Sequence, residues 1–446
     1  MINPSVVQAY DVRGVYPAEL NDETVAALAR AYAAWLKPAT VVLGRDVRVS
    51  SPHLWQIAAD ALTAAGVNVI DIGVISTDML YFAVPTLEAD GGITITASHN
   101  PREYNGMKMV RAEAIPISSD SGLKEIAASL NDAAPPVAAV PGIIIKKDIR
   151  AGYLDHIRSF IDLTALKPLK VVVNGNFGLA AQIVQEALRD TPIEFIPLND
   201  QPDGTFPKGR PDPLIPENRT ETEALVKSSG ADLAIAWDAD ADRCFFFDEH
   251  GDFVDGYFIT TLLAELLLKK NPGSAIIYDP RQIWAIEAVV NRLGGRPIIN
   301  KAGHAFIKES MRRENAVFGG ETSAHYYFRD NFFCDNGMIP ALLLLEHLSQ
   351  SGQSLAKIVR PLRDKYFISG EVNTQVADPV AKLTEIEQQY RDGQITKIDG
   401  LSVAYDDWRF NVRASNTEPI VRLNVEATSR ELCDEKTAAI LDMLKS

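Results

Sequence analysis

Residues 233–243 read LAIAWDADADR, and this stretch indicates the architecture of the chain. Its five leading apolar residues predict a strand that is buried on both faces, as in parallel sheets covered by helices. Side chains two apart on an extended strand lie ~6.6 Å from each other, so the three aspartates can converge only where the chain bends into a tight loop. We therefore predict a buried strand that ends in an acidic loop.

The acidic loop is a candidate metal site. Asp238, Asp240 and Asp242 would repel one another if they converged without a cation, so their clustering implies a metal ion. Oxygen ligands favour Mg²⁺ over zinc. A solvated acidic turn is the alternative, and the apolar strand before the loop and Arg243 after it count against that alternative.

On both sides of this stretch, β-branched runs alternate with helix-period segments. We predict strands at 41–43, 67–72, 93–96, 169–173, 193–196, 233–237, 275–278, 297–299 and 316–318. Helices are predicted at 22–35 and 51–65, and the second starts at Ser50-Ser51-Pro52, where a hydroxyl cap precedes a proline. This alternation predicts an α/β fold of three similar units.

The C-terminal part has a different pattern. After Arg363 we predict a smaller α+β domain with strands at 366–371, 401–404, 408–413 and 420–426 and a closing helix at 431–444. Residues 131–142 contain three prolines, which favours an exposed linker. The predicted domains are 1–142 with the Ser98 loop, 143–252 with the metal loop, 253–363, and 364–446.

Composition argues against several classes of protein. The 446 residues carry 44 Lys and Arg against 59 Asp and Glu, a formal charge of −15, which disfavours binding to nucleic acid or anionic membranes. Three scattered cysteines without a CxxC pair suggest neither a disulfide framework nor a zinc site. The N-terminus lacks a basic segment followed by an apolar run. We expect a cytoplasmic protein that is not embedded in a membrane, and a monomer.

A second motif, TASHNP, occupies residues 96–101, directly after a predicted strand. Ligands of doubly wound sheets collect at the carboxyl ends of strands. Ser98 therefore stands where a reacting hydroxyl would be presented, with His99 or Lys108 as a neighbouring base. A polar turn that ends at Asn100-Pro101 explains the motif equally well.

A third motif, GGETSAH, places Glu321 and Ser323 two residues apart, where both could hydrogen-bond vicinal sugar hydroxyls. Upstream, Gly303 opens a predicted helix whose N–H groups could approach an anion. A capped helix explains that segment equally well.

A fourth motif, RASNTEP, makes a compact set of phosphate donors. Its donor residues are Arg413, Ser415, Asn416 and Thr417, with Arg422 beyond them. An ordinary polar hairpin turn is the alternative.

Six segments together resemble the α-D-phosphohexomutase family, and within it the bacterial phosphomannomutase and phosphoglucomutase group. They are YDVRG at Tyr10, TASHNP around Ser98, DADADR at Asp238, GHAFIK at Gly303, GETSAH at Gly320 and RASNTEP at Arg413. They occur in the family's order and cover essentially the whole chain. The resemblance implies three related α/β domains and a smaller, TATA-binding-protein-like α+β domain around a central cleft.

The resemblance also implies a role for each motif. Ser98 would be the phosphorylated serine, and an oxygen of its phosphate would share Mg²⁺ with Asp238, Asp240 and Asp242. The residues that it places around the transfer site are Arg13, His99, Lys108, Arg243 and His325. The residues that it places on the substrate are Tyr10, Arg281, Gly303, His304, Glu321, Ser323, Arg413, Ser415, Asn416, Thr417 and Arg422.

The implied reaction converts a hexose 1-phosphate into a hexose 6-phosphate. A phosphoryl group would pass from Ser98 to O6 of a mannose or glucose phosphate, giving a hexose 1,6-bisphosphate that also serves as activator. Small-molecule phosphosugars are therefore the expected partners. Either Lys108 or His325 would be the acid–base group.

Two alternatives compete with this interpretation. A phosphomutase similar to haloacid dehalogenases would use Asp238 as its nucleophile, but that signature continues to Thr or Val where Asp242 stands here. A non-catalytic protein that binds sugar phosphates is the second alternative, and the presence of Ser98 beside three aspartates argues against it.

Two features depart from the commoner family pattern. Alanine stands at positions 239 and 241, where many relatives have glycine, so we expect the backbone there to avoid positive φ. Arg281 stands where some relatives have lysine, a change that alters hydrogen-bond geometry and leaves the sugar preference open.

Overall fold

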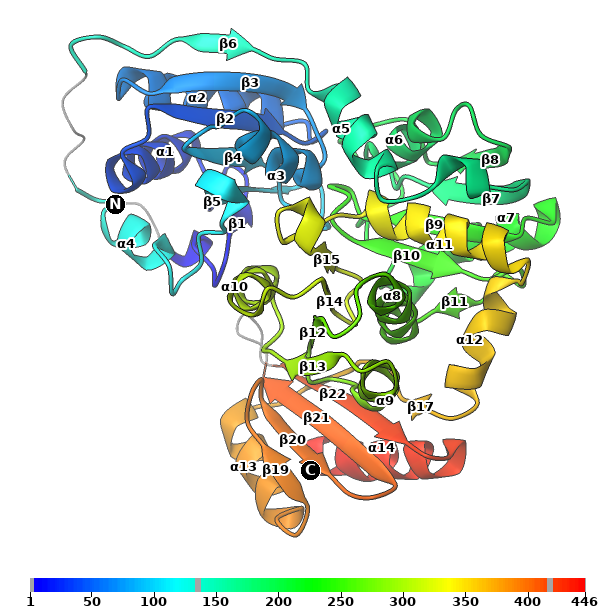
Figure 1. The fold of residues 1–446 in the computed structure, drawn as a ribbon. Helices are drawn as coiled ribbons and strands as arrows, with labels where there is room; N and C mark the ends of the chain where they lie inside the picture. The colour runs from blue at the N-terminus through cyan, green and yellow to red at the C-terminus, as the bar shows by residue number, and fades with distance from the viewer. Residues whose placement is uncertain (1–3, 133–137, 415–419, 446) are drawn as a thin grey trace. The chain divides into compact units, whose positions relative to one another are not determined.

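The computed structural model describes residues 4–132, 138–414 and 420–445 (Figure 1). The chain forms two compact units. The first runs to Phe253 and also includes His325–Ser354, and the second comprises Val254–Ala324 and the chain from Leu355 onward. No helix within the described ranges combines the length and the hydropathy that crossing a bilayer requires.

The N-terminal sheet of the first unit has six strands in the order β1-β5-β4-β2-β3-β6. Its elements are η1 (Pro4–Val6), β1 (Val12–Val15), α1 (Asp22–Leu36), β2 (Thr40–Arg45), α2 (Ser51–Ala64), β3 (Asn68–Val74), α3 (Thr77–Thr86), β4 (Gly91–Ile95), β5 (Tyr104–Arg111), η2 (Ala112–Ala114), α4 (Leu123–Ala128) and β6 (Ile144–Lys146). Strands β2, β3, β4 and β6 are parallel, whereas β5 runs antiparallel to both β4 and β1.

Helices cover both faces of this sheet. A Cβ at Gly91 would lie 2.0 Å from the hydroxyl of Tyr32 on α1, and one at Gly92 would lie 2.5 Å from Val84 on α3. Because successive residues of a strand face opposite sides, α1 and α3 pack directly on opposite faces of β4. Helices α2 and α4 share the core cluster of α1.

The second sheet of the first unit has the strand order β11-β10-β9-β7-β8. Its elements are α5 (Arg150–Arg158), η3 (Leu163–Ala165), β7 (Leu169–Asn174), α6 (Ala180–Ala187), β8 (Ile193–Leu198), η4 (Pro216–Arg219), α7 (Thr220–Ser229), β9 (Leu233–Trp237), β10 (Cys244–Phe247) and β11 (Phe253–Val254). The same unit contains β15 (Tyr326–Phe328), η5 (Arg329–Asn331), β16 (Cys334–Asp335) and α11 (Met338–Ser351). Strand β9 lies inside the sheet and all five of its residues are buried, as predicted.

The second unit begins with a parallel α/β segment. Its elements are α8 (Gly256–Lys270), β12 (Ala275–Tyr278), α9 (Trp284–Arg292), β13 (Arg296–Ile299), α10 (His304–Glu314) and β14 (Phe318–Gly320). Strand β12 is parallel to both β13 and β14.

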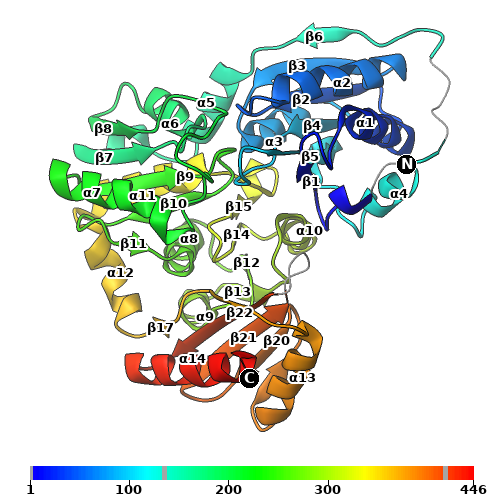
Figure 2. The ribbon, with the colours of Figure 1, turned by 180° about the vertical axis from the view of Figure 1, so that it is seen from behind.

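The C-terminal segment is an antiparallel sheet with helices on one face (Figure 2). Its elements are α12 (Leu355–Arg363), β17 (Phe367–Ile368), β18 (Val372–Gln375), α13 (Pro379–Gln389), β19 (Gln394–Thr396), β20 (Leu401–Ala404), β21 (Trp408–Ala414), β22 (Ile420–Ala427) and α14 (Arg430–Lys445). One core cluster joins α13 and α14 to the inner strands. The predicted fold class, three α/β segments and a smaller α+β segment, is confirmed.

Some local predictions are wrong. The single strand expected at 366–371 is two short strands, β17 and β18, because the chain turns at Gly370 with φ of +69°. Ser50 does not cap α2 through its side chain; its Oγ instead accepts a hydrogen bond of 2.8 Å from Asn105 Nδ2. The strand expected at 316–318 lies at Phe318–Gly320.

Several elements were not predicted individually from the sequence, and strand β5 and helix α13 are two of them. Strand β5 contains Asn105 and Gly106, which disfavour strands, yet it is paired on both edges. Helix α13 starts at Asp378-Pro379, where the Asp378 carboxylate accepts hydrogen bonds of 3.0 Å from the N–H groups of Val380 and Ala381. That start signal was present in the sequence.

Candidate active site

Ser98 lies just beyond the carboxyl end of β4, in the first unit. It is 2% exposed, and its φ of +51° falls in the left-handed region. Its Oγ donates to Asp238 Oδ2 at 3.2 Å and lies 3.1 Å from His99 Nδ1. The serine motif and the acidic motif, which lie far apart in the sequence, therefore meet at this hydroxyl.

The acidic loop closes between β9 and β10 and buries its three carboxylates. Asp238 is 0% exposed, and Asp240 and Asp242 are each 1% exposed. One oxygen from each carboxylate lies within 4.8 Å of the others. The tight bend predicted from the spacing is confirmed.

The expectation that both alanine spacers avoid positive φ is wrong for Ala241, whose φ is +58°. Ala241 N donates to Asp238 O at 3.1 Å and so closes the turn. On the other side Gly337 approaches so closely that a Cβ there would lie 2.3 Å from Ala241 O. Both contacts fix this peptide in the left-handed region. Ala239 keeps a negative φ, as expected.

Two cationic side chains balance the acidic loop. Lys108, delivered by β5, donates to Asp240 Oδ2 at 2.7 Å and also to Asp242 Oδ2. Arg243 Nε donates to Asp238 Oδ2 at 2.7 Å. Burial alone would lower the pKa of Lys108, but the attraction of Asp240 and Asp242 outweighs burial and raises it.

The loop also fits a divalent cation. Asp240 Oδ1 and Asp242 Oδ1 are buried and make no hydrogen bond with any described residue. Such oxygens, together with Asp238 and the adjacent Ser98 Oγ, form an all-oxygen donor set. The acidic cluster could therefore hold a metal ion.

Arg13 lies beside the serine loop, as expected. On β1 it pairs with Gly106 of β5, and its Nη1 donates to Asn100 Oδ1 at 2.6 Å. Tyr10 precedes β1 and is partly buried. Burial, assisted by the positive charge of Arg243, lowers the pKa of His99 well below its usual value.

His325 belongs to the same unit and completes this group. It forms a β-bridge with Arg243, and its Nδ1 lies 3.1 Å from Asp335 Oδ2 and 3.8 Å from Asp242 Oδ1. Asp335 is 0% exposed. A buried carboxylate at one ring nitrogen orients an imidazole.

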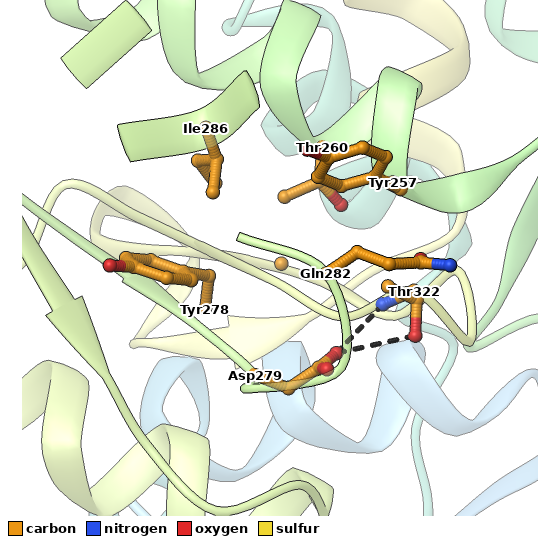
Figure 3. A pocket seen from close by; sticks show the side chains of 8 residues that line it. Tyr257, Thr260, Tyr278, Asp279, Gln282, Ile286 and Thr322 are labelled. Atoms are coloured by element: carbon orange, nitrogen blue, oxygen red, sulfur yellow. Dashed lines mark hydrogen bonds between the residues drawn. The ribbon is translucent and has the colours of Figure 1, made fainter. Parts of the chain in front are cut away.

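In the second unit, Asp279 holds Arg281. Nε and Nη2 of Arg281 donate to the two carboxylate oxygens of Asp279, each at 2.8 Å. Asp279 Oδ2 also accepts from Thr322 N at 2.9 Å and from Thr322 Oγ1 at 3.4 Å (Figure 3). The adjoining cavity of about 10 Å³ has room for about one water molecule and is too small for a sugar.

Arg281 brings the predicted sugar-binding residues together. Its Nη2 donates to Ser323 Oγ at 3.4 Å and lies 3.7 Å from Glu321 Oε1. Glu321 Oε1 also accepts from Gly303 N at 2.9 Å. Gly303 precedes α10, which begins at His304 as predicted. The predicted motifs at 303 and 321 are therefore adjacent.

Arg413 and Arg422 face each other across β21 and β22. Glu371 lies between them: its Oε2 is 3.3 Å from Arg413 Nη2 and its Oε1 is 3.6 Å from Arg422 Nη1. Oε2 is also 3.7 Å from Arg281 Nη1. Burial would raise the pKa of Glu371, but the three guanidinium groups outweigh burial and lower it. The predicted residues Ser415, Asn416 and Thr417 lie outside the described residues.

Three acidic residues that contact predicted site residues were not predicted from the sequence. Asp279 directly follows β12, so its position at a strand end was a usable signal. Asp335 and Glu371 gave no such signal. Asp335 lies near His325 through the pairing of the neighbouring strands β15 and β16, and Glu371 meets Arg413 from 42 residues away.

Comparison with known proteins covers nearly the whole chain. Four domain families described as parts of phosphoglucomutase/phosphomannomutase match it: alpha/beta/alpha domain I at residues 5–136, domain II at 151–251, domain III at 255–366 and the C-terminal domain at 371–443.

Similar proteins and structures extend this match. A phosphomannomutase from Salmonella montevideo is 47% identical over 457 residues, covering 100% of both sequences. A protein named phosphohexose mutases from Xanthomonas campestris pv. campestris is 46% identical over 445 residues, 98% of each. The solved structure of a phosphoglucomutase/phosphomannomutase family protein from Burkholderia thailandensis has a TM-score of 0.89 at 31% identity, covering 100% of this chain and 98% of that one.

The left-handed conformation at Ala241 leads to a prediction about stability. Ala241→Gly should raise the free energy of unfolding by up to about 1 kcal/mol, because relief of a left-handed alanine outweighs the greater freedom of glycine in the unfolded chain. Ala239→Gly is the matched control, and it should lower that free energy by about 0.4–1 kcal/mol. Urea denaturation of both variants tests this, and a less stable Ala241→Gly would contradict it.

Proposed function

The chain belongs to the phosphoglucomutase/phosphomannomutase family, and from this membership we propose that it interconverts hexose 1-phosphates and hexose 6-phosphates, mannose phosphates among them. The observation that carries the proposal is the meeting of Ser98 Oγ with Asp238, at 3.2 Å, inside a buried acidic cluster. Phosphoryl transfer depends mainly on positioning and on neutralising charge. The place of Ser98 at the cluster provides the positioning, and Lys108 and Arg243 provide positive charge.

The reaction uses Ser98 as the phosphoryl carrier. O6 of a hexose 1-phosphate attacks the phosphorus on Ser98 Oγ, the bond from phosphorus to Oγ breaks, and the O6 proton passes to a base on the chain. The product is a hexose 1,6-bisphosphate, which also serves as activator. After it reverses its orientation, its 1-phosphoryl group returns to Ser98 and leaves the 6-phosphate.

Asp238, Asp240 and Asp242 would hold Mg²⁺ together with an oxygen of phosphorylated Ser98. Bound there, the ion would supply positive charge next to the phosphoryl oxygens. Arg243 and Lys108 contribute further positive charge from the chain itself.

His325 is the better candidate for the base. Lys108 Nζ is engaged by Asp240 and Asp242, which favours its protonated form. His325 instead has Asp335 at its Nδ1, an arrangement that orients an imidazole for proton transfer.

Substrate recognition would fall to the second unit. Glu321 and Ser323, with Arg281 between them, would bind sugar hydroxyls. Arg413 and Arg422 would bind the phosphate that is not being transferred, together with the predicted turn at 415–417. These contacts do not distinguish the two configurations at C2, so we expect both glucose phosphates and mannose phosphates to react.

We further propose that the protein is a monomer in the cytoplasm. A monomer in a reducing cytoplasm fits a chain whose three cysteines are buried and form no disulfide with one another.

The alternative with Asp238 as nucleophile has no support from the relatives, and neither does a non-catalytic binding protein.

A phosphorus NMR time course tests the proposed function. Mannose 1-phosphate and glucose 1-phosphate, each with Mg²⁺ and a trace of hexose 1,6-bisphosphate, should both yield the 6-phosphate. Ser98→Ala should abolish the conversion, whereas Ser228→Ala, on the exposed face of α7, should not. Absence of conversion by the wild-type protein would overturn the proposal.

Metal binding is expected to depend on Asp240. Asp240→Asn should weaken Mg²⁺ affinity by about 10- to 100-fold, because one charged ligand is lost. Asp232→Asn removes the same charge from an exposed position just before β9 and is the control. Isothermal titration with Mg²⁺ measures both variants, and equal affinities for the two would remove Asp240 from the metal site.

Glu371 should compete with bound phosphate. Glu371→Gln removes a negative charge from among three guanidinium groups, so the Kd for inorganic phosphate and the KM for both sugar phosphates should fall roughly fivefold, the effect of one nearby charge in a solvated site. Glu385→Gln, an exposed charge-matched change on α13, should leave both constants unchanged. Weaker phosphate binding by Glu371→Gln would mean that Glu371 positions the arginines for phosphate and does not compete with phosphate for them.

A further inference from the structure

Arg48 takes no part in the chemistry described above, yet its guanidinium is bonded to the loop that carries Ser98. It lies between β2 and α2, and its side chain is 0% exposed. Nη2 donates to Ser98 O and Asn100 O, each at 2.7 Å. Nη1 donates to Pro101 O at 2.7 Å and to Tyr104 O at 3.1 Å.

These four bonds fix the path of the loop between β4 and β5. A guanidinium is planar and presents its N–H groups in set directions, so four carbonyls bonded to it are fixed relative to one another. Arg48 is itself held by Asp46, whose Oδ2 lies 3.2 Å from Nε, and by the ring of Phe206, 4.9 Å from the guanidinium carbon. The loop is therefore fastened to the end of β2.

Ser98 needs such support, because its φ of +51° is unfavourable for a residue with a side chain. The backbone N–H and C=O of Ser98 both form hydrogen bonds. Ser98 N donates to Thr96 Oγ1 at 2.9 Å, and Ser98 O accepts from Arg48 at 2.7 Å. In this conformation Oγ lies 3.2 Å from Asp238 Oδ2.

We infer that Arg48 is the positioning residue for the phosphoryl-carrying serine: it holds the 98–104 loop so that Ser98 Oγ is directed at the aspartate cluster. This inference rests on the proposed function. Because the Arg48 side chain is 0% exposed, it acts through Ser98 and not by touching the substrate.

Arg48→Lys provides the test, because it keeps the charge but loses the fork that reaches several carbonyls at once. Displacement of a reacting group by about 1 Å can cost ~100-fold in rate. We expect kcat to fall by about that factor while KM for mannose 1-phosphate stays within about threefold, since substrate binding is assigned to residues of the second unit. Arg102→Lys, in the same loop but 66% exposed, is the control with unchanged kcat.

A second variant covers the case in which Arg48→Lys does not fold. Arg48→Ala should regain part of its kcat when guanidinium ion is added at millimolar concentration, whereas wild type should not gain. An unchanged kcat in folded Arg48→Lys, a loss confined to KM, or no rescue of Arg48→Ala would each overturn the positioning role.

A crystal structure of Arg48→Lys separates this inference from the proposed function. It should show Ser98 outside the left-handed region with Oγ displaced from Asp238. That structure tests whether Arg48 positions Ser98, even if the wild-type protein converts no phosphosugar. An unmoved Ser98 would overturn the inference while leaving the mutase proposal intact.

Discussion

Burial of three carboxylates within 4.8 Å of one another requires compensating positive charge, and the first unit is organised around that requirement. Lys108 reaches the cluster only because β5 runs antiparallel beside β4, and Arg243 reaches it because the chain returns at once into β10. Removing a cation from such a cluster would leave unpaired charge in a region that water does not reach. The pairing of the strands therefore decides whether the negative charge of the loop is compensated.

The second unit handles charge in the opposite way. There the guanidinium groups of Arg281, Arg413 and Arg422 converge on the carboxylate of Glu371. Asp279 also pairs with Arg281, and Asp399 also pairs with Arg413. Arginines placed directly opposite each other on neighbouring strands repel, so the cluster favours an anion. The proposed function assigns the metal ion to the carboxylates of the first unit and the phosphate that is not transferred to the arginines of the second.

The sequence predicted the features that depend on local pattern. The apolar run before Asp238 predicted β9, and the spacing of the aspartates predicted the bend after it. The predicted site residues of the first unit, from Arg13 to His325, lie around one cluster. Local pattern fails where distant segments decide the conformation, as when Gly337 packs against Ala241 and fixes its positive φ. Glu371 and Arg48 were missed for the same reason, since neither lies in a motif.

We propose that Ser98 carries the phosphoryl group, and finding the residue to which the group is attached tests this assignment. The protein would be incubated with hexose 1,6-bisphosphate and Mg²⁺, digested, and examined by mass spectrometry for the site of phosphorylation, with acid and hydroxylamine treatments run in parallel. An acid-stable phosphate on the peptide that contains Ser98 is the expected result. A hydroxylamine-labile phosphate on the peptide that contains Asp238 would contradict it.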